Sequence, residues 1–179
     1  MGRSAHEYPW RYESKWLLQG QKVCILMANT FSQIYIQVVF AVSGRLCLVR
    51  DEFKEELYKY ITGIVRNNGQ KLISINCMPD HVHALVGLKP AMALADLVRD
   101  IKADSSNFIN DNRWIRGKFS WQEGYGAFSY GHSQLDTIIR YIENQEKHHE
   151  RSSFKTEYLS LLKKFEITFD EKYVFKFIE

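Results

Sequence analysis

Two histidines separated by one apolar residue, in the run Pro79-Asp80-His81-Val82-His83, are of a type and spacing that can hold a metal ion. Successive side chains of a β-strand point to opposite faces, so His81 and His83 would face the same side while Val82 packs behind them. Two imidazoles on one side can share one divalent ion, which can polarise a phosphate. The pair predicts half of a metal site.

Tyr141 and Gln145 lie four positions apart further along the chain. Residues at this spacing share one face of a helix, so a phenol and an amide oxygen can be presented to the same ion. Tyrosine can act as a covalent nucleophile, although a phenol with a pKa of about 10 needs help from a metal or a base. The sequence identifies no base. The pattern predicts metal-assisted attack of Tyr141 on a phosphate, with His81, His83 and Gln145 as ligands.

The elements that must position these residues follow from hydrophobic periodicity. Strands are predicted at 32–42, 72–77, 81–88 and within 118–130, and helices at 51–68 and from just after Pro90 through Phe108. The order β-α-β-β-α-β indicates an α+β fold of the ferredoxin-like type, an antiparallel sheet with helices on one face. A further helix, predicted from Ser133 to His149, carries the nucleophile.

The chain divides into three predicted regions. Residues 1–26 have no sustained period and are predicted to be an N-terminal extension, residues 27–150 form the domain, and residues 151–179 form a tail with apolar residues at helical spacing. No stretch reaches the roughly 18 apolar residues of a membrane span, and no secretory signal follows the N-terminus, so we expect a cytoplasmic protein without a membrane partner.

The net charge of +3 does not by itself indicate nucleic-acid binding, because residues 1–26 contribute a surplus of two positive charges. A DNA-binding surface must therefore be local. Single strands bind to positive grooves with stacking aromatic rings, and one region is densest in such residues. Its members are Arg99, Lys102, Arg113, Trp114, Arg116, Lys118 and Trp121, although a solvated helix face and a loop explain them equally well.

Cysteine usage leaves one other metal site open. The three cysteines show no CxxC pair, which argues against a disulfide framework, but Cys77 with His81 and His83 could form the zinc site of a hydrolase. The residues between them are expected to bend the chain away from that arrangement. His148 and His149 are expected to be cations at a helix end, and Asp80 to form a turn or to orient a histidine.

Taken together, the string from Cys77 through Leu85, the segment 121–129 and the segment 141–149 resemble the single-tyrosine HUH transposases of bacterial insertion sequences, including the domesticated REP-associated tyrosine transposases. The resemblance covers about residues 27–149. The extension before Met27 is not part of the family pattern, and the tail beyond Phe154 is longer than in the shortest members.

The resemblance implies a function for the matching residues. His81 and His83 correspond to the HUH motif, Tyr141 to the nucleophile and Gln145 to the amide ligand of Mg²⁺ or Mn²⁺. The implied activity is DNA transposition, in which single-stranded, hairpin-forming DNA is cleaved and rejoined through a 5′-phosphotyrosine. Family members are typically homodimers in which Tyr141 and His81 can come from different subunits. The alternative is a catalytically silent protein that binds or regulates DNA hairpins on the same fold.

Overall fold

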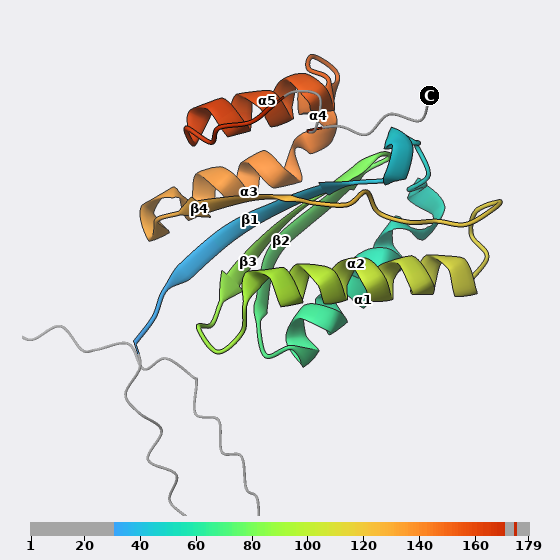
Figure 1. Cartoon of the computed structure of the whole chain (residues 1–179), viewed down its shortest axis with the longest axis horizontal. Helices are drawn as coiled ribbons and strands as arrows, with labels where there is room; N and C mark the ends of the chain where they lie inside the picture. The colour runs from blue at the N-terminus through green and yellow to red at the C-terminus, as the bar shows by residue number, and fades with distance from the viewer. Residues whose placement is uncertain (1–30, 171–173, 175–179) are drawn as a thin grey trace, which may run out of the picture. The chain divides into compact units, whose positions relative to one another are not determined.

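The computed structural model describes residues 31–170 and residue 174 (Figure 1). The predicted extension at 1–26 lies outside the described residues, as do the first positions of the predicted domain at 27–150 and the end of the predicted tail. Among the described residues, no helix combines the length and the apolar character needed to cross a membrane.

Four strands form one antiparallel sheet: β1 (Ile34–Ala41), β2 (Lys71–Met78), β3 (His81–Leu88) and β4 (Gly126–Tyr130). They lie in the order β2-β3-β1-β4. Helix α1 (Asp51–Asn67) connects β1 to β2, and α2 (Leu94–Asp111) connects β3 to β4. The predicted β-α-β-β-α-β order and antiparallel sheet are confirmed, and this strand order is that of the ferredoxin-like arrangement.

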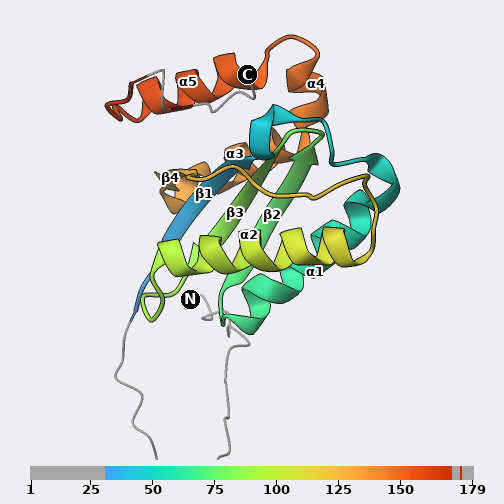
Figure 2. The same ribbon diagram turned by 45° about the vertical axis from the view of Figure 1, so that its right-hand side comes forward.

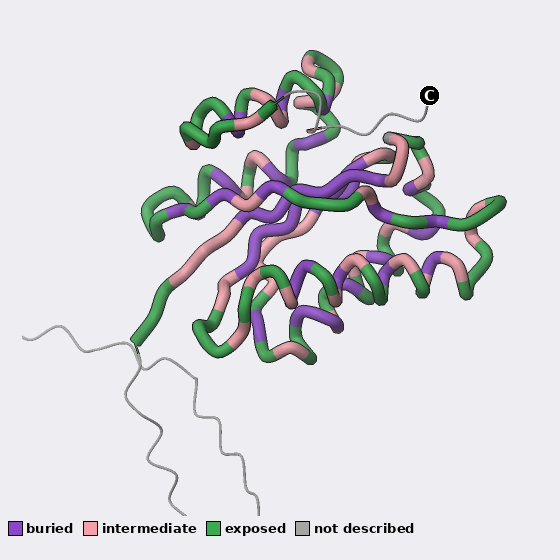
Figure 3. Tube along the Cα trace, viewed as in Figure 1, coloured by how far each residue is buried: buried purple, intermediate pink, exposed green. Residues whose placement is uncertain are grey.

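Helices cover both faces of the sheet (Figures 1 and 2). Helices α1 and α2 pack on one face, as predicted, whereas α3 (Leu135–Glu143), α4 (Gln145–His149) and α5 (Phe154–Lys164) lie over the other. The central strands carry apolar side chains on both faces: Val38 and Phe40 join the core under α1 and α2, while Val39 joins the core under α3 and α5. The buried part of the chain therefore follows the strands (Figure 3).

Helix α1 begins and ends close to where its residue types predict. In α1, apolar residues recur at steps of three and four and are buried against the sheet. Gly69 follows at φ 70°, the left-handed conformation that commonly ends a helix. Two short 3₁₀ segments, η1 (Ser43–Arg45) and η2 (His132–Gln134), precede α1 and α3.

The predicted helix from Ser133 to His149 is divided at Asn144, so the prediction of one continuous helix was wrong there. Asn144 has φ −97° and ψ 21°, and its side-chain nitrogen donates a hydrogen bond to the Arg140 carbonyl at 2.7 Å. Asparagine competes with helical hydrogen bonding in this way and favours helix ends. Tyr141 therefore belongs to α3, whereas Gln145 begins α4.

Asn76 on β2 fixes the end of α3 to the sheet. Its side-chain nitrogen donates to the carbonyl oxygen of Ile142 at 2.8 Å, and its side-chain oxygen accepts from the Tyr58 hydroxyl at 2.9 Å. We expect Asn76→Ala to lower the free energy of unfolding by about 1–3 kcal/mol, because buried partners lose their hydrogen bonds. Urea denaturation measures this loss. The exposed Asn112→Ala is the matched control, and an equal effect of the two substitutions would contradict the role of Asn76.

Candidate metal and nucleophile site

His81 and His83 lie on β3, the strand paired with β1 on one side and β2 on the other. Their side chains are 1% and 0% exposed, and both face α3 and α5. Val82 between them packs in the core under α1 and α2. The strand alternation predicted from the HxH spacing therefore holds in the structure.

The Nδ1 atom of each histidine already has a partner. His81 Nδ1 lies 2.6 Å from the Asp80 carboxylate, and His83 Nδ1 lies 2.9 Å from the side-chain amide of Gln37. Gln37 also binds the Tyr130 hydroxyl. An Nδ1–H that donates outward leaves the Nε2 lone pair for an ion. In the structure Gln37 Nε2 faces His83 Nδ1 and Gln37 Oε1 accepts from the Tyr130 hydroxyl, so His83 offers its Nε2 lone pair to an ion only when the Gln37 amide is turned over.

Glu157, a residue of α5, contacts Tyr141 and Gln145 with one carboxylate oxygen and faces the histidines with the other. The Tyr141 hydroxyl donates to Glu157 Oε1, and Gln145 Nε2 donates to the same oxygen at 2.9 Å. The Tyr141 and His83 rings are 6.0 Å apart between centroids. Within one chain, the structure thus brings together the residues that the sequence singled out.

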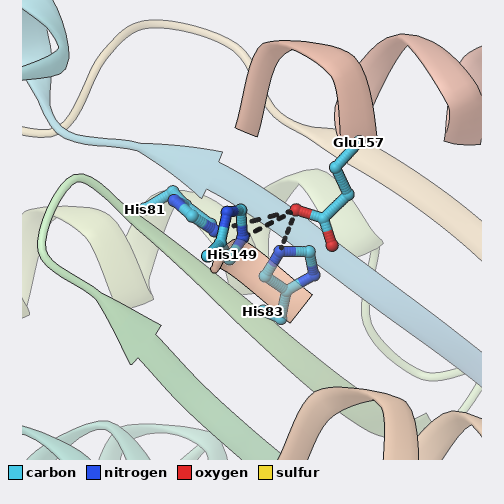
Figure 4. A group of neighbouring side chains, drawn as sticks. All are labelled: His81, His83, His149 and Glu157. Atoms are coloured by element: carbon cyan, nitrogen blue, oxygen red, sulfur yellow. Dashed lines mark ion pairs between the residues drawn. The ribbon is translucent and has the colours of Figure 1, made fainter. Parts of the chain in front are cut away.

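Four side chains converge on one point: His81, His83, His149 and Glu157 (Figure 4). Glu157 Oε2 lies 3.9 Å, 3.5 Å and 3.0 Å from the Nε2 atoms of His81, His83 and His149. These four atoms are buried, and beyond the contacts between Glu157 Oε2 and the imidazoles they have no hydrogen-bond partner among the residues that the structure describes. Such orphaned polar atoms are costly unless an ion or a water satisfies them, so the cluster fits a divalent metal.

The sequence interpretation missed His149 and Glu157. His149, expected to be a cation at a helix end, does end α4, but its Nδ1 lies 3.0 Å from the Ser152 carbonyl oxygen and its Nε2 faces Glu157. Glu157 did carry a signal. It lies three residues after Phe154 and four before Leu161, in the buried stripe of α5, where an acidic residue is out of place unless it is paired.

Charge and burial set the protonation of the site. Burial lowers the pKa of His81 from 6.5 to about 4, despite the nearby Asp80 carboxylate. Burial alone would raise the pKa of Glu157, but His149, His83 and Tyr141 outweigh it and hold that pKa well below 4.5. Burial and the Glu157 charge raise the pKa of Tyr141. At neutral pH the site therefore holds a neutral imidazole at His81, an ionised Glu157 and a neutral phenol.

These pKa shifts predict that the metal-free protein loses stability as the pH falls. Between pH 6.5 and 4 the unfolded chain binds a proton at His81 that the folded chain does not, so the free energy of unfolding falls by up to about 1.4 kcal/mol per pH unit. Stabilisation from the Glu157 carboxylate is present above about pH 4.5 and is lost below it. Urea denaturation in chelator tests this. His81→Gln should give a flatter profile, and identical slopes would contradict the prediction.

Cys77 does not share the site. It pairs with Val82 across β2 and β3 and packs with it under α1 and α2, on the other side of the sheet from the histidines. Burial raises the pKa of its thiol to about 12, so it stays protonated. The zinc site of Cys77, His81 and His83 considered from the sequence is therefore excluded, and the thiol is a core residue.

The residues considered for DNA binding separate into two groups. Trp121 is 7% exposed and donates to Ser105, and Trp114 stacks on Phe53, so both rings pack within the protein. Arg99 pairs with Asp96 and Asp100, and Lys102 donates to the carbonyl oxygens of Gln122 and Gly124. By contrast, the loop after α2 has exposed cationic residues at Arg113, Arg116 and Lys118.

A groove of about 290 Å³ leads to the nucleophile. It lies between α3 and α5, and Tyr141, His148, Glu157 and Lys164 are among the residues that line it. Its lining includes the cationic Lys164 and the hydroxyl groups of Thr137 and Ser160, which suit an anionic ligand, and also the ionised Glu157.

Comparisons with known proteins identify the family of the chain and relatives of its fold. A model of the IS200-like transposase family matches residues 30–145. The ISDra2 transposase TnpA of Deinococcus radiodurans is 26% identical over 120 residues, 63% of this chain and 84% of that protein. A crystal structure of a putative transposase from the same organism aligns over 72% of this chain and 98% of its own, with a TM-score of 0.53 and 24% identity. A REP-associated tyrosine transposase bound to a REP hairpin aligns over 65% and 68%, with a TM-score of 0.51 and 15% identity.

Proposed function

Because this chain belongs to the IS200-like transposase family, we propose that it cleaves and rejoins single-stranded DNA through a covalent bond to Tyr141. The observation that carries the proposal is the position of the Tyr141 hydroxyl. It lies in the groove between α3 and α5 and is hydrogen-bonded to the carboxylate that also faces His81 and His83. The proposed nucleophile is therefore adjacent to a proton acceptor, Glu157, and to the two histidines proposed to bind the metal.

In the proposed reaction the Tyr141 oxygen attacks phosphorus and its proton passes to Glu157 Oε1, the oxygen that accepts its hydrogen bond. The Tyr141 oxygen becomes bonded to the phosphorus, which keeps its 5′ oxygen, while the bond from phosphorus to the 3′ oxygen breaks and that oxygen takes up a proton from water to leave as a 3′-hydroxyl. Attack by another 3′-hydroxyl reverses these steps and joins strands without ATP.

A divalent ion, Mg²⁺ or Mn²⁺, would be held by His81 and His83, with Gln145 as the amide ligand. When bound, it supplies positive charge that polarises the scissile phosphate and stabilises the transition state. The Gln145 side chain is fully buried, and its Oε1 atom has no hydrogen-bond partner among the described residues, which supports this role. Its nitrogen holds Glu157 in place.

The proposed substrate is single-stranded DNA next to a hairpin. Two observations support it: the groove beside Tyr141 is lined by Lys164 and by hydroxyl groups, and the fold resembles that of a REP-associated transposase bound to a REP hairpin. Of the seven residues considered for DNA binding, Arg113, Arg116 and Lys118 are the ones we propose to contact phosphates. The homodimer also remains a proposal, to be tested by light scattering of the full chain.

The test uses single-stranded oligonucleotides from the ends of the protein's own genetic locus, incubated with Mn²⁺ or with chelator. A 3′ label should move with the protein on a denaturing gel, because the tyrosine retains the 5′ phosphate, whereas a 5′ label should mark a shorter product with a free 3′-hydroxyl. Mass spectrometry of the digested adduct should place the nucleotide on the peptide that contains Tyr141.

Each outcome decides between the two functions left open by the sequence. A metal-dependent adduct on Tyr141 supports the transposase. Tight binding of the same oligonucleotides without any adduct, in Mn²⁺ and with correct ends, would instead favour a silent hairpin-binding protein.

A further inference from the structure

We infer that His149 and Glu157 complete the metal site and make it selective for a transition-metal ion over Mg²⁺. The inference rests on the proposed function, since it concerns the ion bound by His81 and His83. Both added ligands follow the segment 30–145 that the family model matches. The site is thus partly built by the chain that follows the family segment.

The positions of the ligand atoms support this set. With metal–ligand bonds of about 2.0–2.1 Å, neighbouring ligand atoms in a tetrahedral site stand about 3.3 Å apart. Glu157 Oε2 lies 3.0–3.9 Å from the three imidazole Nε2 atoms, and the four ligand atoms all lie within 4.8 Å of one another. An ion at their centre requires the more widely spaced ligand atoms to move closer together.

The outer hydrogen bonds favour the same set. His81 and His149 present Nδ1 to oxygen acceptors, the Asp80 carboxylate and the Ser152 carbonyl, which places a proton on Nδ1 and makes Nε2 the nitrogen that can bind an ion once it carries no proton. The two carboxylate oxygens of Glu157 have different partners: Oε1 accepts from Tyr141 and Gln145, whereas Oε2 faces the imidazoles. One carboxylate therefore joins the ion to the nucleophile.

Ligand chemistry determines which ion such a site prefers. Mg²⁺ favours oxygen ligands and keeps several waters, whereas imidazoles suit zinc, copper, iron and nickel ions. Three imidazoles and one carboxylate therefore disfavour Mg²⁺. In a six-coordinate ion such as Mn²⁺, these four ligands and the Gln145 amide leave one position for a phosphate oxygen.

The experiment measures metal binding without DNA. The full chain, stripped with chelator, is titrated calorimetrically with Mn²⁺, Zn²⁺ and Mg²⁺. We expect binding of Mn²⁺ and Zn²⁺ at one equivalent and Mg²⁺ binding at least about 100-fold weaker. Glu157→Gln and His149→Ala should each weaken Mn²⁺ binding by about tenfold to 100-fold or more. The exposed residues Glu150 and His132 provide the matched controls Glu150→Gln and His132→Ala.

A spectroscopic readout separates ligation from a structural role. Both variants should shift the visible absorption of bound Co²⁺, which depends on the identity of the ligands, while their metal-free thermal melting reports any folding defect. Unchanged Mn²⁺ affinity and an unchanged Co²⁺ spectrum in both variants would overturn the inference, as would Mg²⁺ binding as tightly as Mn²⁺. Those results would leave the proposed function standing, because it is judged by the Tyr141 adduct.

Discussion

Tyr141→Phe should abolish the covalent DNA adduct while leaving metal binding within about threefold of wild type. The substitution removes a single oxygen atom, so the groove between α3 and α5 keeps its shape. Loss of a covalent nucleophile typically costs a factor of roughly 10⁴ or more in rate, since no other group can form the intermediate. The denaturing-gel assay with 3′-labelled oligonucleotide measures the adduct, and Mn²⁺ titration measures the ion.

Tyr60→Phe is the matched control for this substitution. Tyr60 is 37% exposed and lies on α1, on the face of the sheet opposite the site. The Tyr60→Phe protein should therefore form the covalent DNA adduct at the wild-type rate. An adduct that persists in Tyr141→Phe would assign the chemistry to another residue and would contradict the proposed function.

His83→Ala should remove both metal binding and cleavage. His83 is fully buried and its Nε2 atom faces the cluster, so its loss deletes a ligand and leaves a gap that no neighbouring residue can fill with a nitrogen. We expect Mn²⁺ affinity to fall by more than about 100-fold, since disturbing residues that only orient metal ligands already costs tenfold to 100-fold. Calorimetric titration gives the affinity, and the adduct assay gives the activity.

His83→Gln keeps most of the volume and tests whether a packing defect explains the loss. Metal-free stability near wild type together with weak Mn²⁺ binding would support a ligand role. Full cleavage by either variant at low Mn²⁺ concentration would show that His83 is dispensable and would refute the site.

The sequence predicted the half of the site that lies on regular elements. Alternation along a strand placed His81 and His83 on one face, and this required only that β3 be a strand. The same alternation carries Cys77 to the other face, which the sequence could not decide because it depends on the register between β2 and β3.

The positions of Tyr141, Gln145 and Glu157 depend on where the helices end and the chain changes direction. Helical spacing placed Tyr141 and Gln145 on one face, but the interruption at Asn144 depends on a local competition for hydrogen bonds that periodicity does not report. Glu157 reaches the histidines because α5 folds back over the sheet, a tertiary contact with no motif of its own. Trp121 was considered for stacking and is instead a core residue, because its loop runs alongside β1 and forms a bridge to Val42.

The position of β3 inside the sheet has a consequence for amide hydrogen exchange. Backbone amides of β3 are hydrogen-bonded to β1 or β2, so they should exchange slowly, through global unfolding, whereas α5 should open locally at lower free energy. An ion bound by His81, His83 and Glu157 would link β3 to α5. Adding it should slow exchange across α5 by the factor 1 + [ion]/Kd for this local opening, so that the protection of α5 becomes a direct record of metal occupancy.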